Sequence, residues 1–259
     1  MEGVSDRVAL VTGAGSGDGI GFATARLLAA AGARVAITST TKRIFDRLQE
    51  LPMRDAKGKA AFIADLTDAK AAKKLVADVV KQFGRIDILI NNAGMIQTGK
   101  RSKISLVHQI DDAEWRRTFE INMDTCFFVT RATVPYMIRR KYGRIVNISS
   151  VSGPLVIYPR GGAYGSAKAA MTGFTRALAH ELAGKGITAN AVAPGWIATG
   201  SSSAWEIKAG RNTPTGRSGR AEEVGAVALF LAGEAASYVN GQMIVVDGGN
   251  TIQEYKGAE

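Results

Sequence analysis

Tyr164 and Lys168 are two residue types that together can move a proton at neutral pH. They stand four residues apart in Tyr164-Gly-Ser-Ala-Lys168, at the start of a helical pattern, so both side chains share one helix face. An isolated tyrosine titrates near pH ~10, whereas a nearby ammonium group stabilises the phenolate. We therefore expect Lys168 to lower the pKa of Tyr164 toward the working range of an acid–base group. Ser150, after the preceding predicted strand, offers a hydroxyl that could hold a substrate carbonyl. Alone the Tyr–Lys spacing is common, and a surface contact is the alternative.

A glycine-rich stretch near the start of the chain is suited to a phosphate group. Thr12-Gly-Ala-Gly-Ser-Gly-Asp-Gly-Ile-Gly21 follows the first predicted strand directly and precedes a helix. Glycines let the backbone turn tightly and approach an anion, and the helix N-terminus supplies free N–H groups. The spacing is neither G-x-G-x-x-G nor a P-loop, which would need a lysine. The stretch indicates a dinucleotide site.

The residues after the second predicted strand bear on the choice of cofactor. An acidic residue there would bind the adenosine ribose and repel a 2′-phosphate. This chain has Ser39-Thr-Thr-Lys-Arg43 instead, and hydroxyls with two cations suit a phosphate dianion. NADP(H) is therefore favoured over NAD(H). An ordinary polar turn is the alternative, and Asp18 in the glycine loop would oppose a nearby 2′-phosphate.

Strand and helix patterns that could position these residues alternate from end to end. Several of the strand patterns are almost wholly apolar, as strands buried on both faces should be. The alternation predicts a single α/β domain over residues 1–259, a Rossmann-type, doubly wound parallel sheet of seven strands. The irregular segments Met95–Asp111 and Gly200–Arg220 follow strand ends, where such sheets bind ligands. The predicted strands are Arg7–Thr12, Arg34–Thr38, Ala60–Asp65, Ile86–Asn91, Arg144–Ser149, Ile187–Ala193 and Met243–Asp247, and the predicted helices are Gly21–Ala31, Asp68–Gln82, Asp112–Lys141, Ala163–Gly184 and Ala221–Leu231.

Composition narrows the class of protein. One Cys cannot form an intrachain disulfide, and two His with one Cys argue against a zinc site, so no metal is expected. No apolar run approaches the ~18 residues of a membrane span, and the start lacks the order of a signal peptide, so a cytoplasmic protein is expected. The net charge of +10 favours anionic partners, although a solvated basic surface is the alternative. Nucleic acid is disfavoured because no recognition motif is present.

In their order, the motifs resemble the short-chain dehydrogenase/reductase family over residues 6–250, and most closely 3-oxoacyl-[acyl-carrier-protein] reductases and related ketoreductases. Three features depart from the family pattern. The glycine loop is two residues longer, the step from Ser150 to Tyr164 is 14 residues, and the segments bordering the substrate pocket differ in length. The matching motifs are Thr12–Gly21, Asp65-Leu66, Asn91-Asn-Ala-Gly94, Asn122, Ser150, Tyr164/Lys168, Pro194-Gly-Trp-Ile-Ala-Thr199 and Val246-Asp-Gly-Gly249.

The resemblance implies a role for each member of a catalytic set. Tyr164 would be the general acid that protonates the carbonyl oxygen, or the base in the alcohol direction. Lys168 would lower the pKa of Tyr164 and bind the nicotinamide ribose. Ser150, or in its place Ser149, would orient the carbonyl, and Asn122 would position a water in the proton relay to Lys168.

The resemblance also implies a cofactor-binding set. The glycine loop would contact the pyrophosphate, with Asp65 on the adenine and Asn91 on the ribose side. Thr199 would hold the nicotinamide carboxamide or the phosphates. The expected set is Gly13, Ser16, Asp18, Gly19, Ile20, Ser39, Thr40, Thr41, Asp65, Leu66, Asn92, Ala93, Gly94, Tyr164, Lys168, Pro194, Gly195, Ile197 and Thr199.

We expect an NADP(H)-dependent oxidoreductase that interconverts a ketone and a secondary alcohol. The alternatives are an NAD(H)-dependent dehydrogenase of a sugar, polyol or steroid alcohol, and a nucleotide-binding protein without chemistry. A homotetramer is implied, with the helices Asp112–Lys141 and Ala163–Gly184 at one interface and the last strand at the other. Trp196 and Trp205 could line an apolar substrate pocket, and Lys141 with Lys185 could dock an acyl carrier protein. His108 and His180 are expected at the surface or in packing, and Cys126 in the core.

Overall fold

A parallel sheet of seven strands runs through the centre of the protein. The computed structural model describes residues 3–53, 55–94 and 105–254. The strand order is β3-β2-β1-β4-β5-β6-β9. The strands are β1 (Val8–Val11), β2 (Arg34–Ser39), β3 (Lys59–Ile63), β4 (Ile88–Asn91), β5 (Gly143–Ile148), β6 (Ile187–Pro194) and β9 (Met243–Val246). Each overlaps one of the seven strands that the sequence predicts.

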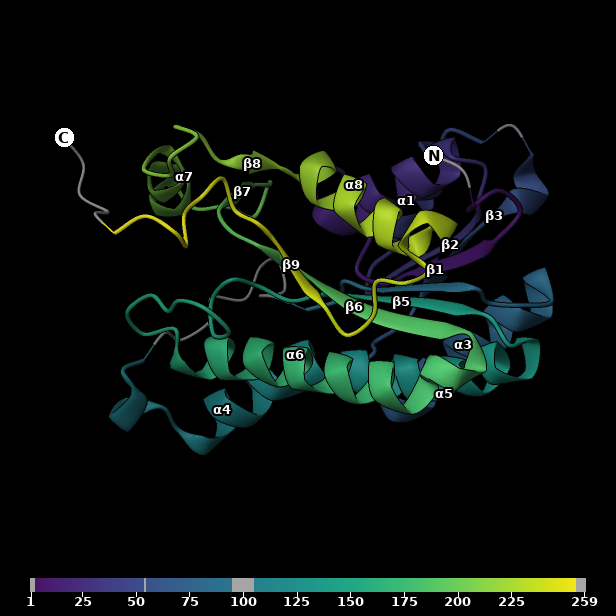
Figure 1. The fold of residues 1–259 in the computed structure, drawn as a ribbon, viewed down its shortest axis with the longest axis horizontal. Coiled ribbons are helices and arrows are strands. Elements are labelled where there is room, and N and C mark those ends of the chain that lie inside the picture. Colours follow the sequence, from purple (N-terminus) through teal and green to yellow (C-terminus); the bar gives the residue numbers. More distant parts are fainter. Residues whose placement is uncertain (1–2, 54, 95–104, 255–259) are drawn as a thin grey trace.

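Helices cover both faces of this sheet (Figure 1). α1 (Ile20–Ala30) and α8 (Ala221–Ala232) pack on one face, and α3 (Ala69–Phe83), α5 (Thr125–Arg140) and α6 (Gly162–Leu182) on the other. Successive strand side chains alternate between the two cores, so that Val11 faces α1 and α8 whereas Leu10 faces α3 and α5. Burial on both faces explains the apolar strand sequences, and the predicted fold class is confirmed. Its extent over residues 1–259 stays a prediction.

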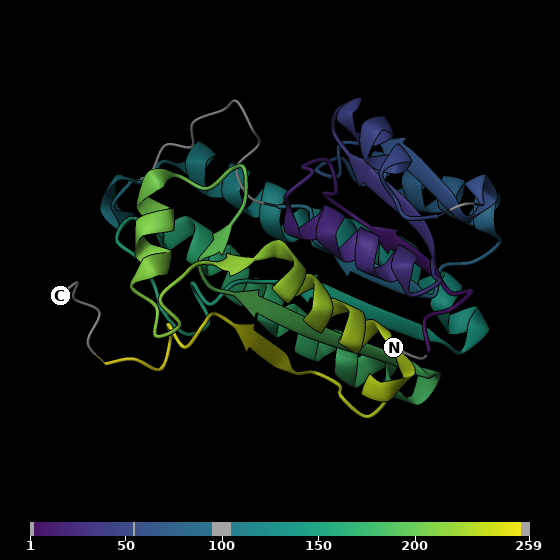
Figure 2. The ribbon, with the colours of Figure 1, turned by 90° about the horizontal axis from the view of Figure 1, so that it is seen from above.

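The carboxyl ends of the strands gather the loops that carry the predicted site. The strand order reverses between β1 and β4, and open α/β sheets bind ligands in the crevice at such a point. A two-stranded sheet of β7 (Ile197–Ala198) and β8 (Gly219–Arg220) and helix α7 (Ala204–Arg211) stand at the same end (Figure 2). The chain after β9 also runs toward α7 (Figure 1). In the described ranges no helix is long and apolar enough to cross a membrane.

The predicted helix Asp112–Lys141 is interrupted in the structure. α4 (Asp112–Phe119) is followed by a π-helical turn, η3 (Glu120–Asp124), and then by α5. The Asp111 carboxylate caps α4 by accepting the N–H of Glu114 at 2.8 Å. At the other end Lys141 takes a left-handed conformation, φ +51°, as the C-cap of α5. The spacing of apolar residues along the sequence does not predict this π turn. The turn contains Asn122.

Shorter elements fill the remaining connections. Helix α2 (Arg43–Gln49) begins directly after the Ser39–Lys42 turn, and it and α7 are absent from the predicted helices. The other short elements of these connections are single 3-10 turns. They are η1 (Ala56–Gly58), η2 (Val107–Gln109), η4 (Ala183–Lys185) and η5 (Glu234–Ala236).

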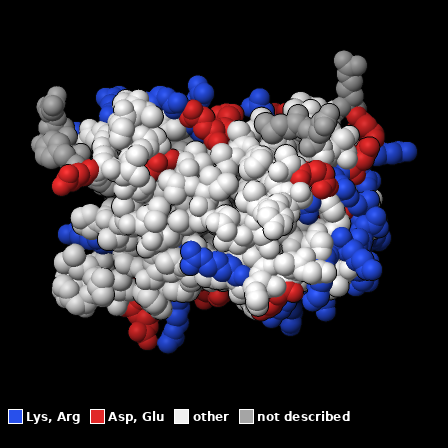
Figure 3. All heavy atoms as spheres, in the orientation of Figure 1, with Lys and Arg blue, Asp and Glu red and all other residues white. Residues whose placement is uncertain are grey.

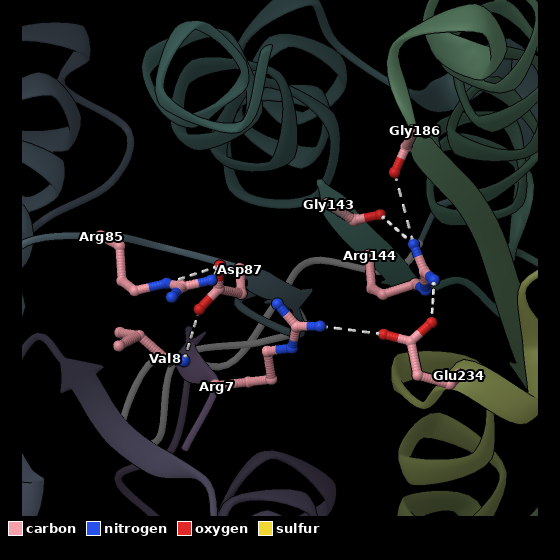
Figure 4. A network of polar contacts seen from close by, with 8 residues as sticks. All are labelled: Arg7, Val8, Arg85, Asp87, Gly143, Arg144, Gly186 and Glu234. Atoms are coloured by element: carbon pink, nitrogen blue, oxygen red, sulfur yellow. Dashed lines mark hydrogen bonds and ion pairs between the residues drawn. The ribbon is translucent and has the colours of Figure 1, made fainter. Parts of the chain in front are cut away.

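The opposite end of the sheet is held by ion pairs (Figure 4). Glu234 accepts from Arg7 at 3.1 Å and from the nearly buried Arg144 at 3.0 Å, so it joins β5 to the segment before β1. The fully buried Asp87 accepts from Arg85 at 2.6 Å and from the backbone N–H of Val8 at 2.9 Å. These contacts fix the amino ends of the strands and leave the carboxyl ends to the site.

Candidate active site

Two adjoining cavities occupy the carboxyl ends of the strands. The large cavity, about 670 Å³, lies between the β5–α6 loop, β7 and α7, and the small cavity, about 230 Å³, lies beside the glycine loop and the ends of β2 and β3. Both are lined in part by the same side chains, so the two spaces are contiguous. The shared lining residues are Ile20, Asn92, Ile121, Thr199 and Ser201.

The structure brings the four predicted catalytic residues together in the wall of the large cavity. Tyr164 lies in the first turn of α6 and Lys168 one turn later, with the Lys168 Nζ 5.8 Å from the centre of the Tyr164 ring. Ser150 lies two residues beyond β5, and Asn122 projects from the π turn. The predicted helix face and strand end thus meet at one point of the cavity.

Gly94 allows Asn122 and Lys168 to approach each other. A Cβ at this position would lie 3.0 Å from the Asn122 Oδ1 and 3.6 Å from the Lys168 Nζ, and its φ of +151° favours glycine. The Asn122 Nδ2 donates to the carbonyl of Thr118 at 3.0 Å, which leaves the Oδ1 on the Lys168 side. The π turn therefore turns a buried amide toward the ammonium group.

The two neighbouring serines have different partners. The Ser149 hydroxyl donates to the carbonyl of Lys168 at 3.0 Å and ties β5 to α6. The Ser150 hydroxyl accepts the N–H of Ser152 at 3.1 Å and forms the hydrogen bond with Tyr164 that opposes the rise of the Tyr164 pKa. Ser150 is thus the serine at the tyrosine hydroxyl, and Ser149 is engaged with the backbone.

The expectation that the pKa of Tyr164 falls toward the working range is wrong in this structure. Burial raises the pKa of Tyr164 above its usual value, and it also lowers the pKa of Lys168 to about 8. Tyr164 is consequently a phenol at neutral pH, which is the form that can donate a proton, and the Lys168 Nζ donates to the carbonyl of Ile148 at 3.0 Å.

Most of the predicted cofactor residues line one of the two cavities. The glycine loop reaches the end of β2 because Gly15 has no side chain: a Cβ there would lie 2.8 Å from the Ser39 Cβ. Thr41 lines neither cavity. The small cavity has Gly13, Ser16, Gly19, Ile20, Ser39, Thr40, Asp65, Leu66, Asn92, Ala93, Gly94 and Thr199, and the large one has Tyr164, Lys168, Pro194, Gly195 and Ile197.

The structure differs from the predicted cofactor site at Asn91 and Asp18. The Asn91 side chain points into the core, where its Nδ2 donates to Thr130 and Asn147 at 2.8 Å each, because alternate strand residues face opposite sides. Asp18 lines neither cavity. Its carboxylate accepts from Ser16 at 2.7 Å and lies against Gly200. Asp18 is therefore not a lining residue of the predicted cofactor site.

An aromatic wall borders the large cavity next to Tyr164. The Tyr158 ring lies 6.4 Å from those of Tyr164 and Trp196 and 6.2 Å from that of Trp205, and the two tryptophans meet at 5.1 Å. The prediction that both tryptophans line this pocket is confirmed. The sequence reasoning missed Tyr158 and Arg160, which lie on the loop between Ser150 and Tyr164 and also line the cavity.

Other lining residues missed from the sequence come from the C-terminal segment. Asn250 and Gln253 line the large cavity because the Asp247 carboxylate accepts the N–H groups of Gly249 and Thr251, at 2.9 and 2.7 Å, and turns the chain back. The Asp-Gly-Gly sequence was the available signal for such a turn. Thr67, also missed, lines the small cavity together with Arg43, which the sequence analysis had named beside the expected phosphate.

The remaining single residues lie away from both cavities. His108 and His180 are exposed and Cys126 is buried, as expected. Lys141 and Lys185 precede β5 and β6 at the amino ends of the strands, whereas both cavities are at the carboxyl ends. The proposed docking role of these two lysines is therefore not supported. Of the segment Met95–Asp111, which the sequence places beside a ligand site, residues 95–104 lie outside the described residues.

Comparison with known proteins agrees with this geometry. Residues 13–251 match the family described as enoyl-(acyl carrier protein) reductase. The chain is 40% identical to the 3-oxoacyl-[acyl-carrier-protein] reductase of Thermotoga maritima, over 95% of this chain and 98% of that protein. It is 39% identical to the galactitol 2-dehydrogenase (L-tagatose-forming) of Cereibacter sphaeroides, over 94% of each. A crystal structure assigned as a gluconate dehydrogenase of Agrobacterium tumefaciens has a TM-score of 0.86 at 33% identity, covering 96% of this chain and 97% of that one. The chain belongs to the short-chain dehydrogenase/reductase family, and it is an oxidoreductase that interconverts a ketone and a secondary alcohol.

Proposed function

We propose that the protein reduces a ketone with NADPH and that Tyr164 donates the proton to the carbonyl oxygen. The observation that carries the proposal is the meeting of Ser150, Tyr164, Lys168 and Asn122 in the wall of the large cavity. A nicotinamide cofactor, when bound, supplies the hydride. The chain supplies orientation and the proton.

The raised pKa of Tyr164 supports the direction of reduction. A phenol that stays protonated at neutral pH is ready to act as a general acid. The Ser150 hydroxyl, already at the tyrosine oxygen, would donate to the same carbonyl oxygen. As the proton leaves Tyr164, the Lys168 ammonium group would stabilise the phenolate that forms, and Asn122 would hold a water on the path that returns a proton.

The lining of the small cavity supports NADP(H). Ser39, Thr40 and Arg43 line it at the end of β2, and Asp65 is its only acidic lining residue in the described part of the chain. The Asp65 carboxylate accepts the N–H and the hydroxyl of Thr67 at 3.0 and 2.7 Å, so it faces its own loop. The Ser39 hydroxyl donates to the Thr41 carbonyl at 3.0 Å and thus shapes the turn. The arginine would supply the attraction for a 2′-phosphate.

Replacing Arg43 tests the cofactor assignment. Arg43→Ala is expected to raise the KM for NADPH roughly tenfold and to leave that for NADH unchanged, because the lost charge meets only the 2′-phosphate. Lys42→Ala is the matched control, since Lys42 lines neither cavity. Initial rates with both cofactors and a panel of ketones give the readout. A wild-type enzyme that prefers NADH would contradict the assignment.

Oxidation of a polyol or sugar alcohol with NAD is the second candidate. Hydroxyl and amide side chains of Ser152, Ser202, Asn212, Asn250 and Gln253 line the large cavity and could bind hydroxyl groups. The similarity to a galactitol 2-dehydrogenase points the same way. Faster turnover of a polyol with NAD than of any ketone with NADPH at pH 7 would favour this candidate.

A homotetramer in the cytoplasm is part of the proposal. The edge strand β9 and its flanks expose three large apolar or aromatic residues, Tyr238, Val245 and Ile252. Figure 3 shows few charged side chains on this face, whereas Lys and Arg gather at one end of the molecule. Light scattering should give the mass of four subunits, and a mass near one subunit would contradict the assembly. The single, buried thiol of Cys126 fits a reducing compartment.

A further inference from the structure

Arg160 occupies a backbone position that favours glycine. The turn Tyr158-Pro159-Arg160-Gly161 is closed by the Gly161 N–H, which donates to the Tyr158 carbonyl at 3.0 Å. Its third residue has φ +67°, as in a type II turn with proline in second place. A side chain in the left-handed region costs about 1 kcal/mol. Two glycines follow directly in the sequence, yet an arginine holds the strained position.

Among the described residues, no polar contact of the Arg160 side chain explains the strain. In the described ranges its guanidinium takes part in no hydrogen bond or ion pair. It lines the large cavity, four residues before Tyr164 and on the same loop as the aromatic residue Tyr158. Strained residues persist where the surrounding structure or the function requires them, and they cluster at binding sites.

The other charged side chains of the large cavity are already engaged. The Lys168 Nζ donates to the Ile148 carbonyl at 3.0 Å. Glu206, the only acidic lining residue of the described chain, accepts the Ser203 N–H at 2.7 Å and its hydroxyl at 2.8 Å as the cap of α7. Arg160 is therefore the cation of the cavity wall that is open to a ligand.

We propose that Arg160 is a specificity-determining residue that binds the carboxylate of the substrate, so that the preferred substrates are oxo acids. The inference rests on the proposed ketone reduction at Ser150 and Tyr164. The planar guanidinium matches a carboxylate in a bidentate geometry, which a lysine or a neutral side chain does not reproduce. The carbonyl would lie at Tyr164, in the first turn of α6, and the acid group at Arg160, in the loop that precedes this helix.

Arg160→Gly separates the binding role from a structural one, because glycine suits this turn better than arginine does. The substrate pair is a short 3-oxo acid and its methyl ester, which differ in charge at nearly equal size. We expect the KM for the acid to rise roughly ten- to hundredfold and that for the ester to stay within about twofold, with kcat little changed. The thermal midpoint of the variant should rise, since backbone strain is relieved.

Lys141→Gly is the matched control. Lys141 also has a positive φ, +51°, but it ends α5 at the opposite end of the sheet from the cavity. This variant should gain stability in the same way and keep both KM values. Arg160→Lys should retain part of the preference for the acid, because lysine keeps the positive charge but lacks the planar guanidinium that binds a carboxylate through two hydrogen bonds. A stability gain confined to Lys141→Gly would contradict the strain argument at Arg160.

A binding readout separates this inference from the proposed function. Trp196 and Trp205 line the cavity, so quenching of tryptophan fluorescence reports binding of the acid without turnover. Arg160-dependent binding of the acid without turnover of any ketone would support the carboxylate site and contradict the proposed reduction. Turnover of ketones with equal KM changes for acid and ester in Arg160→Gly, or with no change in either, would overturn the carboxylate site and leave the reduction intact.

Discussion

Replacing the buried Lys168 by methionine should make the enzyme slower and the fold more stable. Lys168 is 3% exposed, and burial lowers its pKa from 10.5 to about 8. Its Nζ lies 5.8 Å from the Tyr164 ring. A unit charge at that distance stabilises a phenolate by about 3 kcal/mol at an effective dielectric of about 20, which corresponds to a rate factor on the order of a hundred. Lys168→Met should lower kcat for reduction by that factor.

The same residue should set the alkaline limb of the pH profile. Reduction by the wild-type enzyme needs the Lys168 ammonium group, so its rate should be constant from pH 6 to 7 and fall as the pH rises through about 8. Lys168→Met has no such group and should lose this limb. Because Tyr164 keeps its proton at neutral pH, alcohol oxidation should rise with pH instead.

Lys168→Met should raise the stability of the fold although it lowers the rate. Keeping Lys168 charged in the fold below pH 8 costs about 3 kcal/mol, from the difference between 10.5 and about 8. A lysine with a depressed pKa destabilises the folded state at neutral pH, and this cost fades as the pH rises from about 8 to 10.5. The free energy of unfolding of the methionine variant at pH 7 should therefore be higher by up to that amount. The variant should accordingly unfold at a higher denaturant concentration.

Steady-state rates from pH 6 to 10 and urea unfolding at pH 7 test both parts. Lys185→Met, which removes an exposed lysine in η4, is the control and should change neither quantity. A Lys168→Met enzyme that keeps wild-type kcat, or one that retains the alkaline limb near pH 8, would refute the reasoning.

Three further predictions follow from the hydrogen bonds and burial. Ser149→Ala should cost about 1 kcal/mol of unfolding free energy with kcat within a few-fold, whereas Ser150→Ala should lower kcat at least tenfold; the reverse pattern would exchange their roles. Glu234→Ala should destabilise by about 2 kcal/mol in urea unfolding because a nearly buried arginine loses its partner, while Asp78→Ala, from an exposed helical pair, should cost under about 0.5 kcal/mol. The Cys126 thiol, whose pKa burial raises to about 12, should resist alkylation at pH 8 until the protein unfolds; rapid labelling of the native protein would contradict its burial.

The fold could be predicted because its signals are local. Strands buried on both faces must be apolar, and a helix between consecutive strands forces a parallel crossover, so the run of patterns implies the sheet. The site followed from motif order, since Ser150, Tyr164 and Lys168 belong to one strand end and one helix that pack together.

The parts that could not be predicted depend on tertiary environment. The pKa of Tyr164 is set by burial, which no spacing of residues encodes. Asp18 lies against Gly200, which is far from it in sequence, and the π turn at Asn122 leaves the apolar pattern unchanged. The left-handed Arg160 contradicts its local propensity, and such conflicts are expected at functional positions.

Reduction of a ketone by Tyr164→Phe tests the central claim most directly. The phenylalanine keeps the ring and removes the proton donor, and general acid catalysis contributes about 10² to 10⁴ in rate. Tyr158→Phe is the matched control, because its ring lies in the same aromatic wall at 6.4 Å. The account predicts that Tyr164→Phe binds NADPH as the wild type does, by nucleotide fluorescence, while kcat falls at least a hundredfold and Tyr158→Phe stays within tenfold. Wild-type kcat in Tyr164→Phe would contradict the assignment of the proton donor.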